Sequence, residues 1–187
     1  DRIGGQATLE FAGGGGKSHR ETAVVTDHDE ATRRVLAWLE SAGFLGGLDG
    51  VGHRVVHGGD RFLEPTLIDA EVVDAIEALT DLAPLHNAPS LKAIRAARAV
   101  LGAGVPMVAT FDTAFHRTLP ERASRYAIPL ELADKHRIRR YGFHGLSCEY
   151  IMSELRAEAG DRVADGRVVI AHLGNGASMT AVHGGRS

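Results

Sequence analysis

The 187-residue sequence predicts an α/β fold, because segments with strand periodicity alternate with segments that have helical periodicity. A short apolar run at 105–110 reads as a buried strand and leads into Phe111, Asp112 and Thr113 at its carboxyl end. Open α/β sheets often carry their functional groups at such a carboxyl end. Hydrophobic residues make up 44% of the chain, which is enough for a core, and the length suits one large domain or parts of two.

The first elements expected are two strands at 7–11 and 17–25, joined through the glycines at 13–16 as a hairpin. A helix should begin after Asp27, a candidate N-cap with Glu30 three residues later, and should stop at Gly43. Its apolar face is expected to carry Ala31, Val35, Trp38, Leu39 and Ala42.

The remaining elements follow from the same periodicities. Helices are predicted at 70–80, 89–101 and 146–159, and strands at 52–57, 105–110, 167–172 and 178–182. The segment 114–145 is expected to be loop-rich and basic, and 173–177 to form a tight turn.

Composition and charge exclude several classes of function. The formal net charge of −3 provides no basic field for nucleic acid, and no apolar run has the length of a membrane span. Cys148 is the single cysteine, so no intrachain disulfide is possible, and we expect a reducing, cytoplasmic compartment.

Two glycine-rich stretches imitate nucleotide motifs. The run 13–18 ends in Gly-Lys-Ser, but the position that a P-loop needs as its first glycine is Phe11. The run 174–176 begins like a dinucleotide fingerprint, but its third glycine would be Met179 and it leads into a strand. The sequence therefore predicts neither a P-loop at 13–18 nor a dinucleotide-binding site at 174–176.

His53 and His57 are four residues apart, the spacing of a metal-binding pair on a helix. The valines between them favour a strand, where side chains four apart lie about 13 Å from each other. A structural or positioning role is favoured, and a histidine-based metal site remains the alternative.

Four segments, read in order, resemble the acetate kinase family. They are 53–59 (HRVVHGG), 111–116 (FDTAFH), 141–145 (YGFHG) and 172–178 (HLGNGAS), with 84–87 (PLHN) between the first two. The resemblance is strong from about residue 50 to 187 and loose before it.

This resemblance implies a ribonuclease H-like fold of the acetate and sugar kinase/actin superfamily, with two α/β domains and a cleft between them. Residues 1–113 would form most of the first domain and 114–187 the beginning of the second. The implied reaction is reversible transfer of the γ-phosphoryl group of ATP to acetate, with Mg²⁺, in a homodimer. The family's first phosphate-binding segment, a second arginine and a metal-linked glutamate have no counterpart here, so we expect an internal fragment that is inactive alone and has no metal ligands.

The resemblance also implies catalytic and binding roles for individual residues, and the chemistry of each side chain suits its role. Arg54 would bind the carboxylate through its guanidinium fork, and His144 would stabilise the transferring phosphoryl group. The family gives Asp112 an acid/base role, but an ionised carboxylate has no proton to lose, so orientation of other groups suits it better. The loop His172, Leu173, Gly174, Asn175 and Gly176 would hold nucleotide phosphate, and Val56, Leu85 and Phe143 would line the acyl pocket.

Three alternatives stay open at this point. The first is a propionate or butyrate kinase, whose acceptor acid is longer than acetate by one or two methylenes. One methylene changes the binding free energy in a pocket by only about 1–3 kcal/mol. A non-catalytic ligand-binding remnant of the same fold and the histidine-based metalloenzyme are the other two.

Overall fold

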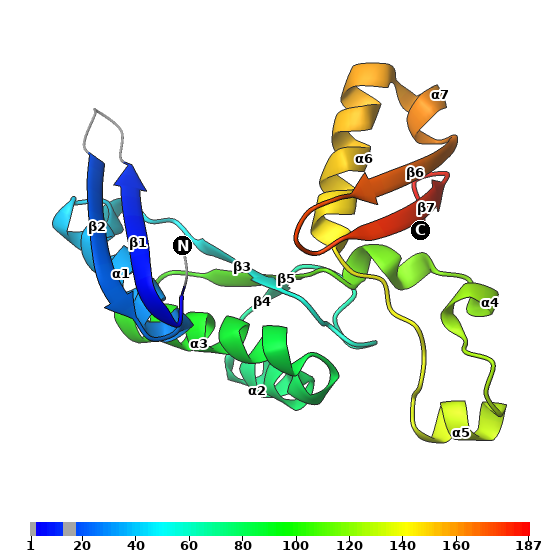
Figure 1. The fold of residues 1–187 in the computed structure, drawn as a ribbon, viewed down its shortest axis with the longest axis horizontal. Coiled ribbons are helices and arrows are strands. Elements are labelled where there is room, and N and C mark those ends of the chain that lie inside the picture. The colour runs from blue at the N-terminus through cyan, green and yellow to red at the C-terminus, as the bar shows by residue number, and fades with distance from the viewer. Residues whose placement is uncertain (1–2, 13–17) are drawn as a thin grey trace. The chain divides into compact units, whose positions relative to one another are not determined.

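The computed structural model describes residues 3–12 and 18–187 (Figure 1). Most of the run 13–18, and with it the hairpin turn expected there, lies outside the described residues. The chain forms two compact units, Asp1–His53 with Leu67–Ala109, and Arg54–Thr66 with Thr110–Ser187. They are called unit 1 and unit 2 below. The division into domains at residue 113 stays a prediction.

Unit 1 begins with an antiparallel pair of strands, β1 (Gly5–Ala12) and β2 (Ser18–Val25), in the register Gly5↔Val25 to Ala12↔Ser18. Helix α1 (His28–Ser41) and the turn η1 (Leu45–Gly47) follow. The ring of Phe11 on β1 stacks on Trp38 of α1, with 5.1 Å between their centroids. The buried side chain of α1 is Leu36, which the predicted apolar face did not include, and Val35 of that face is 41% exposed. Leu39 and Trp38 of the predicted face do pack, on the core cluster and on Phe11.

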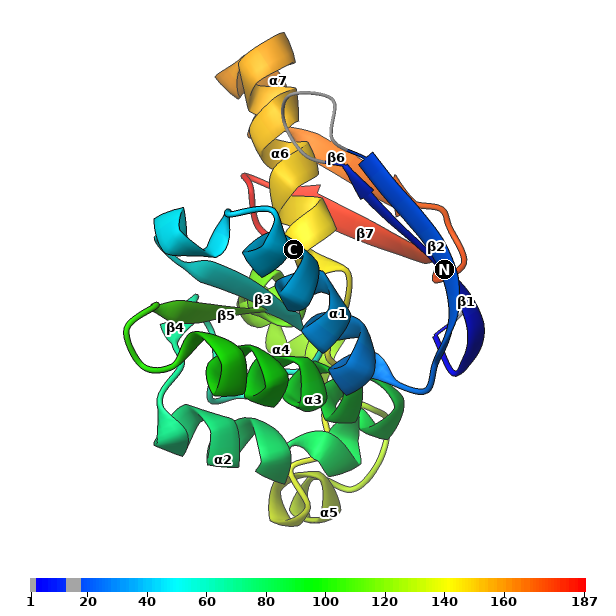
Figure 2. The ribbon, with the colours of Figure 1, turned by 90° about the vertical axis from the view of Figure 1, so that its left-hand side faces the viewer.

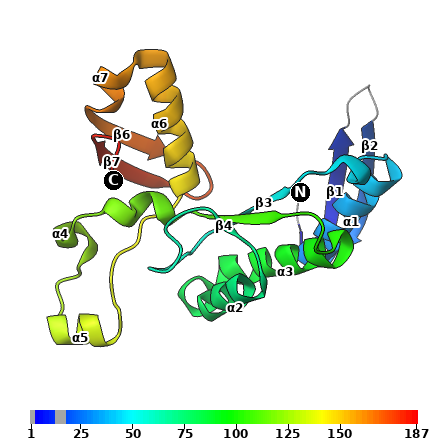
Figure 3. The same ribbon diagram turned by 180° about the vertical axis from the view of Figure 1, so that it is seen from behind.

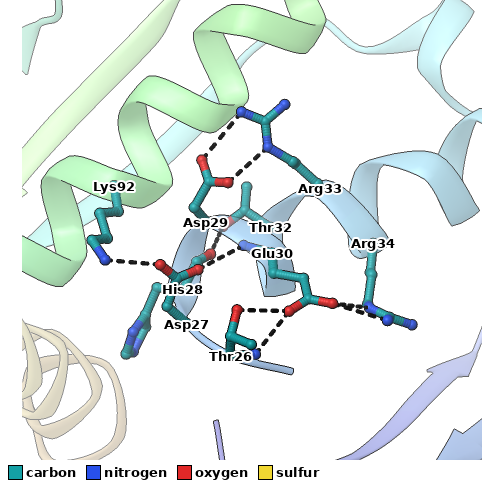
Figure 4. Close-up of polar contacts among 9 residues, drawn as sticks. All are labelled: Thr26, Asp27, His28, Asp29, Glu30, Thr32, Arg33, Arg34 and Lys92. Carbon is teal, nitrogen blue, oxygen red and sulfur yellow. Dashed lines mark hydrogen bonds and ion pairs between the residues drawn. The ribbon is translucent and has the colours of Figure 1, made fainter. Parts of the chain in front are cut away.

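The start of α1 is fixed by polar contacts (Figure 4). Asp27 is the N-cap, and its carboxylate accepts the backbone N–H of Glu30 at 3.0 Å. The Glu30 carboxylate accepts from the N–H and the hydroxyl of Thr26, both at 2.8 Å, one residue earlier than in a standard capping box. Lys92 of α3 reaches Asp27 at 2.8 Å, which ties the two helices together at this end.

Helices α2 (Ala70–Ala78) and α3 (Pro84–Leu101), with the turn η2 (Thr80–Leu82) between them, complete unit 1. Figure 2 shows α3 alongside α1, where Leu36, Ala97 and Met107 share a core cluster. The predicted start of α3 at Pro89 is wrong by five residues. Pro84 occupies the first turn, where a missing N–H costs nothing, and Pro89 lies inside the helix.

A three-stranded sheet has the order β3 (Val51–Val55), β5 (Met107–Phe111), β4 (Thr66–Leu67). Val51 donates its N–H to the Pro106 carbonyl, and Asp112 donates its N–H to the Val55 carbonyl. Residue numbers therefore rise together along β3 and β5, so these strands are parallel and end side by side. β3 stops two residues before the predicted end.

The chain leaves β3 through Gly58 and Gly59, for which there is a steric reason. A Cβ at Gly58 would lie 2.7 Å from the Phe62 carbonyl oxygen and 2.9 Å from the ring of Phe111. Gly59 has a φ of +63°, a region that glycine reaches without strain. His57 consequently lies in this turn, outside the strand.

Unit 2 continues through η3 (Ala114–Thr118) and two short helices, α4 (Glu121–Ser124) and α5 (Leu130–Lys135). These three short helical elements lie in the segment 114–145, which was expected to be loop-rich. Then come α6 (Gly145–Ala159), α7 (Asp161–Ala164) and the antiparallel hairpin β6 (Arg167–His172) and β7 (Ser178–His183), close to their predicted bounds.

Figure 3 shows α6 against this hairpin. Their core consists of Cys148, Met152, Ala164, Ile170 and Val182. In the described parts of the chain, no helix has the length and apolar character that a membrane crossing requires.

Candidate active site

The candidate site begins with an ion pair where β3 and β5 end. Arg54 Nε lies 3.1 Å from Asp112 Oδ1, and Arg54 Nη2 lies 2.6 Å from Asp112 Oδ2. The Asp112 side chain is only 1% exposed, whereas that of Arg54 is 57% exposed. A buried carboxylate is costly unless a cation and hydrogen bonds compensate it, and the guanidinium fork supplies both.

The pair leaves part of Arg54 available. A guanidinium has two edges that make two-point contacts, one with Nε and one Nη, the other with both Nη atoms. Asp112 occupies the first edge, and its hydrogen bonds raise the pKa of Arg54 further, so the charge is permanent. The exposed second edge can meet an external anion. Asp112 thus holds the inner edge of the guanidinium, and binding of a carboxylate at the outer edge stays a prediction.

His144 reaches this region because α6 starts directly behind it. The residue is the N-cap of α6 in the left-handed conformation, with φ 57° and ψ 29°. The next residue, Gly145, packs so closely on the backbone of Asp112 that a Cβ there would lie 2.0 Å from the Asp112 carbonyl oxygen. A side chain at residue 145 would therefore separate His144 from Asp112.

The turn between β6 and β7 meets His144 from the other side. The imidazole of His144 stacks on that of His172, with centroids 4.1 Å apart and planes 16° apart. A Cβ on Gly176 would lie 3.1 Å from His144 Nε2, so the glycine lets the turn approach this nitrogen. Arg54, Asp112, His144 and the turn 172–176 are therefore brought together within unit 2.

The two stacked imidazoles are held by serine hydroxyls. His144 Nδ1 lies 2.9 Å from Ser178 Oγ, and His172 Nδ1 lies 3.0 Å from Ser147 Oγ. Burial lowers the pKa of His144, the neighbouring His172 and Arg54 lower it further, and Asp112 opposes them. A pKa below 6.5 favours the neutral ring of His144 at pH 7.

A buried layer supports the segment that carries His144. His116 is 2.9 Å from the Phe143 carbonyl through Nε2, and 2.8 Å from Ser187 Oγ through Nδ1. A Cβ on Gly142 would lie 2.2 Å from the His116 ring, so this glycine allows the close packing. His57 accepts the Gly59 N–H at Nδ1, with 2.9 Å between the nitrogens, and its ring contacts Tyr141 edge-on.

Sequence reasoning assigned no role to several residues that shape this site. Examples are Ser178, Ser147 and His116. Ser178 and His116 lie within two of the four family-like segments, 172–178 and 111–116, but those segments were quoted for other residues. Hydroxyls and buried imidazoles have no periodicity, so their partners become visible only in three dimensions.

The predicted acyl-pocket residues are divided between the two units. Val56 is half-buried in unit 2, and the centroid of the Phe143 ring lies 5.6 Å from that of His57 in the same unit. Leu85 lies on α3 in unit 1 and is 82% exposed. A pocket shared by all three stays a prediction.

The described residues do not fit a magnesium site by themselves. No group of three or more His, Cys, Asp or Glu side chains in 3–12 and 18–187 is arranged to hold a metal ion. Both carboxylate oxygens of Asp112 are hydrogen-bonded to Arg54, which leaves this buried group poorly placed as a ligand. His57 uses Nδ1 to accept the Gly59 N–H, so the His53 and His57 pair gains no support as a metal site.

Comparison with known proteins gives a consistent result. Residues 3–187 match the model of the Acetokinase family. The chain is 53% identical over 175 residues to an acetate kinase of Arthrobacter sp. (strain FB24), covering 94% of this chain and 45% of that protein. It is 49% identical over 195 residues to an acetate kinase of Streptomyces griseus, covering 100% and 47%. The chain thus spans about half the length of the curated relatives it matches.

Solved structures agree. A propionate kinase from Francisella tularensis superposes with a TM-score of 0.88 at 35% identity, covering 100% of this chain and 47% of that one. Porphyromonas gingivalis acetate kinase gives a TM-score of 0.81 at 35% identity, covering 97% and 46%. These matches confirm the predicted fold class of the acetate and sugar kinases. The chain belongs to the acetokinase family.

Proposed function

We propose that the complete protein is an acetate kinase, which transfers the γ-phosphoryl group of ATP reversibly to acetate and yields acetyl phosphate and ADP. The observation that carries this proposal is the meeting of Arg54, His144 and the turn 172–176 in unit 2 of a chain from this family. A carboxylate-binding cation, a hydrogen-bond donor and an approachable backbone turn are the groups that this reaction needs.

Substrate binding begins at Arg54. Acetate is already ionised at neutral pH, so it needs no base, but it must approach a polyanionic phosphate. The exposed edge of the guanidinium binds the carboxylate, while Asp112 holds the other edge and fixes the orientation of the fork. Asp112 therefore acts as a positioning residue, which agrees with its burial.

Transition-state stabilisation falls to His144 and the turn. The neutral imidazole donates a hydrogen bond to an equatorial phosphoryl oxygen, where negative charge is spread during transfer. Gly174 and Gly176 have no Cβ, so backbone N–H groups of the turn can approach the nucleotide phosphates.

Magnesium, ATP and ADP, a cytoplasmic location and a homodimer belong to the same proposal and rest on the family. When bound, Mg²⁺ would neutralise charge on the ATP phosphates. The resemblance implies that its protein ligands lie outside the described residues.

Propionate is the second candidate acceptor. The observation that favours it is the TM-score of 0.88 to a propionate kinase. Val56, Leu85 and Phe143 are proposed to line the acyl pocket, and a pocket distinguishes acids that differ by one methylene by only about 10- to 200-fold.

The test uses the complete protein with ATP, Mg²⁺ and acetate, propionate or butyrate, with acyl phosphate trapped by hydroxylamine. The highest kcat/KM is expected for acetate. A higher value for propionate would select the second candidate, and no acyl phosphate from any of the three would reject a carboxylate kinase.

A further inference from the structure

Two imidazoles in unit 2 share an unusual arrangement. His144 and His172 stack 4.1 Å apart, and each has its Nδ1 at a serine hydroxyl. The hairpin register places Ser178 directly opposite His172, so the stacked ring and the hydroxyl reach His144 from the same two-stranded unit. Nothing in the packing of the hairpin core requires a hydroxyl at residue 178, because Ser178 is outside that core.

The tautomer of a neutral imidazole depends on such a contact. One ring nitrogen carries the hydrogen and the other carries a lone pair, and the partner of one nitrogen decides the state of the other. If Ser178 donates to Nδ1, the hydrogen of His144 is on Nε2. If Ser178 accepts from Nδ1, a lone pair is on Nε2.

Nε2 is the nitrogen that faces the turn 172–176. The position of a Cβ on Gly176 would be 3.1 Å from it. A lone pair there would repel a phosphoryl oxygen, whereas an N–H would bind it. Of the two tautomers, the form with Nε2–H is the one that suits an anion at this turn.

We propose that Ser178 is a positioning residue, which donates its hydroxyl hydrogen to Nδ1 of His144 and thereby keeps the ring hydrogen on Nε2. Both the choice of this tautomer and the role of its hydrogen rest on the proposed function, because the anion at the turn is what favours Nε2–H. The ring must be neutral for this control to matter. Burial, His172 and Arg54 favour the neutral form, and Asp112 is the neighbouring charge that opposes it.

The direct test is ¹⁵N NMR of the chain with labelled histidine, since nitrogen shifts distinguish a protonated ring nitrogen from one with a lone pair. In the wild type, His144 should show Nε2–H and an unprotonated Nδ1. Ser178→Ala should convert His144 to a mixture of both tautomers, and Ser178→Thr should restore the single form. Ser147→Ala is the matched control, because it removes the hydroxyl at His172 and should leave the tautomer of His144 unchanged.

Wild-type His144 with its hydrogen on Nδ1, or an unchanged tautomer in Ser178→Ala, would overturn the inference. In the complete enzyme, Ser178→Ala should lower kcat about 3- to 10-fold, with KM nearly unchanged and recovery in Ser178→Thr. A complete protein that makes no acyl phosphate while His144 keeps Nε2–H would reject the proposed function and support the tautomer assignment. An active enzyme in which His144 carries its hydrogen on Nδ1 would support the proposed function and reject the tautomer assignment.

Discussion

Asp112 shows how one buried charge organises its neighbours. Its carboxylate is almost fully buried, and the two bonds to Arg54 are the means by which unit 2 compensates it. Removing one partner of such a pair leaves an uncompensated charge, which costs more than the pair itself contributes. The exposure of Arg54 reduces this cost, because water screens the outer half of the interaction.

Arg54→Ala should therefore lower the free energy of unfolding by about 2 kcal/mol in urea titrations. Arg95→Ala is the matched control, because Arg95 and Glu77 form an ion pair at 2.8 Å in which both side chains are half exposed. That change should cost less than about 0.5 kcal/mol. Equal losses in the two variants would show that Asp112 does not depend on Arg54.

His116 should make stability depend on pH. Burial lowers its pKa in the folded state below the ordinary value of 6.5, with the Phe143 carbonyl and Asp112 partly opposing this and His144 adding to it. Just below pH 6.5 the unfolded chain therefore binds more protons than the folded chain. The stabilisation is complete above pH 6.5 and is lost as the pH falls towards the folded pKa.

The free energy of unfolding, measured from pH 7.5 down to about 5, should accordingly fall in the wild type and fall less steeply in His116→Gln. Some slope should remain, since burial also lowers the pKa of His57. Identical slopes in the two proteins would contradict a neutral, buried His116.

At the scale of elements, the segment 141–145 connects His116, the candidate site and the start of α6 in unit 2. Gly142 packs on His116, His144 carries the imidazole, and Gly145 starts α6 against the backbone of Asp112. The two glycines are thus required by packing, and only one residue of the three carries the proposed chemistry.

Gly145→Ala should cost about 3 kcal/mol of unfolding free energy, because the new Cβ would meet a backbone oxygen at 2.0 Å. Gly104→Ala is the control, as a Cβ at that turn position would have nothing within 4 Å. It should change stability by no more than about 0.5 kcal/mol. A thermal or urea unfolding curve of Gly145→Ala that matches the control would refute the close packing.

Elements with strong local signals could be predicted from the sequence. The N-cap Asp27, α6 and the β6–β7 hairpin are observed close to their predicted bounds, because caps, helical periodicity and turn residues act locally. The errors arise where tertiary packing decides. β3 ends early because the chain must turn beneath Phe111, and α3 extends back to Pro84 although a second proline follows.

At the scale of the whole molecule, the four family-like motifs indicated the site residues, which helix and strand periodicity alone could not. The resemblance assigned roles to Arg54, Asp112, His144 and the turn 172–176, and the structure brings them together in unit 2 although more than 100 residues separate the first from the last. The roles of these residues stay predictions. The hydroxyls of Ser147 and Ser178 could not have been found, because a side-chain partner distant in sequence leaves no local pattern.

The account depends most on His144 as a donor to the transferring phosphoryl group. Steady-state kinetics of His144→Ala in the complete enzyme, with ATP and acetate, test this directly, and exposed His183→Ala serves as the control. We predict that kcat falls about 100-fold or more while KM for acetate changes only a few-fold, as expected when a transition-state interaction is lost. An unchanged kcat, or a rise confined to KM, would contradict the proposed site.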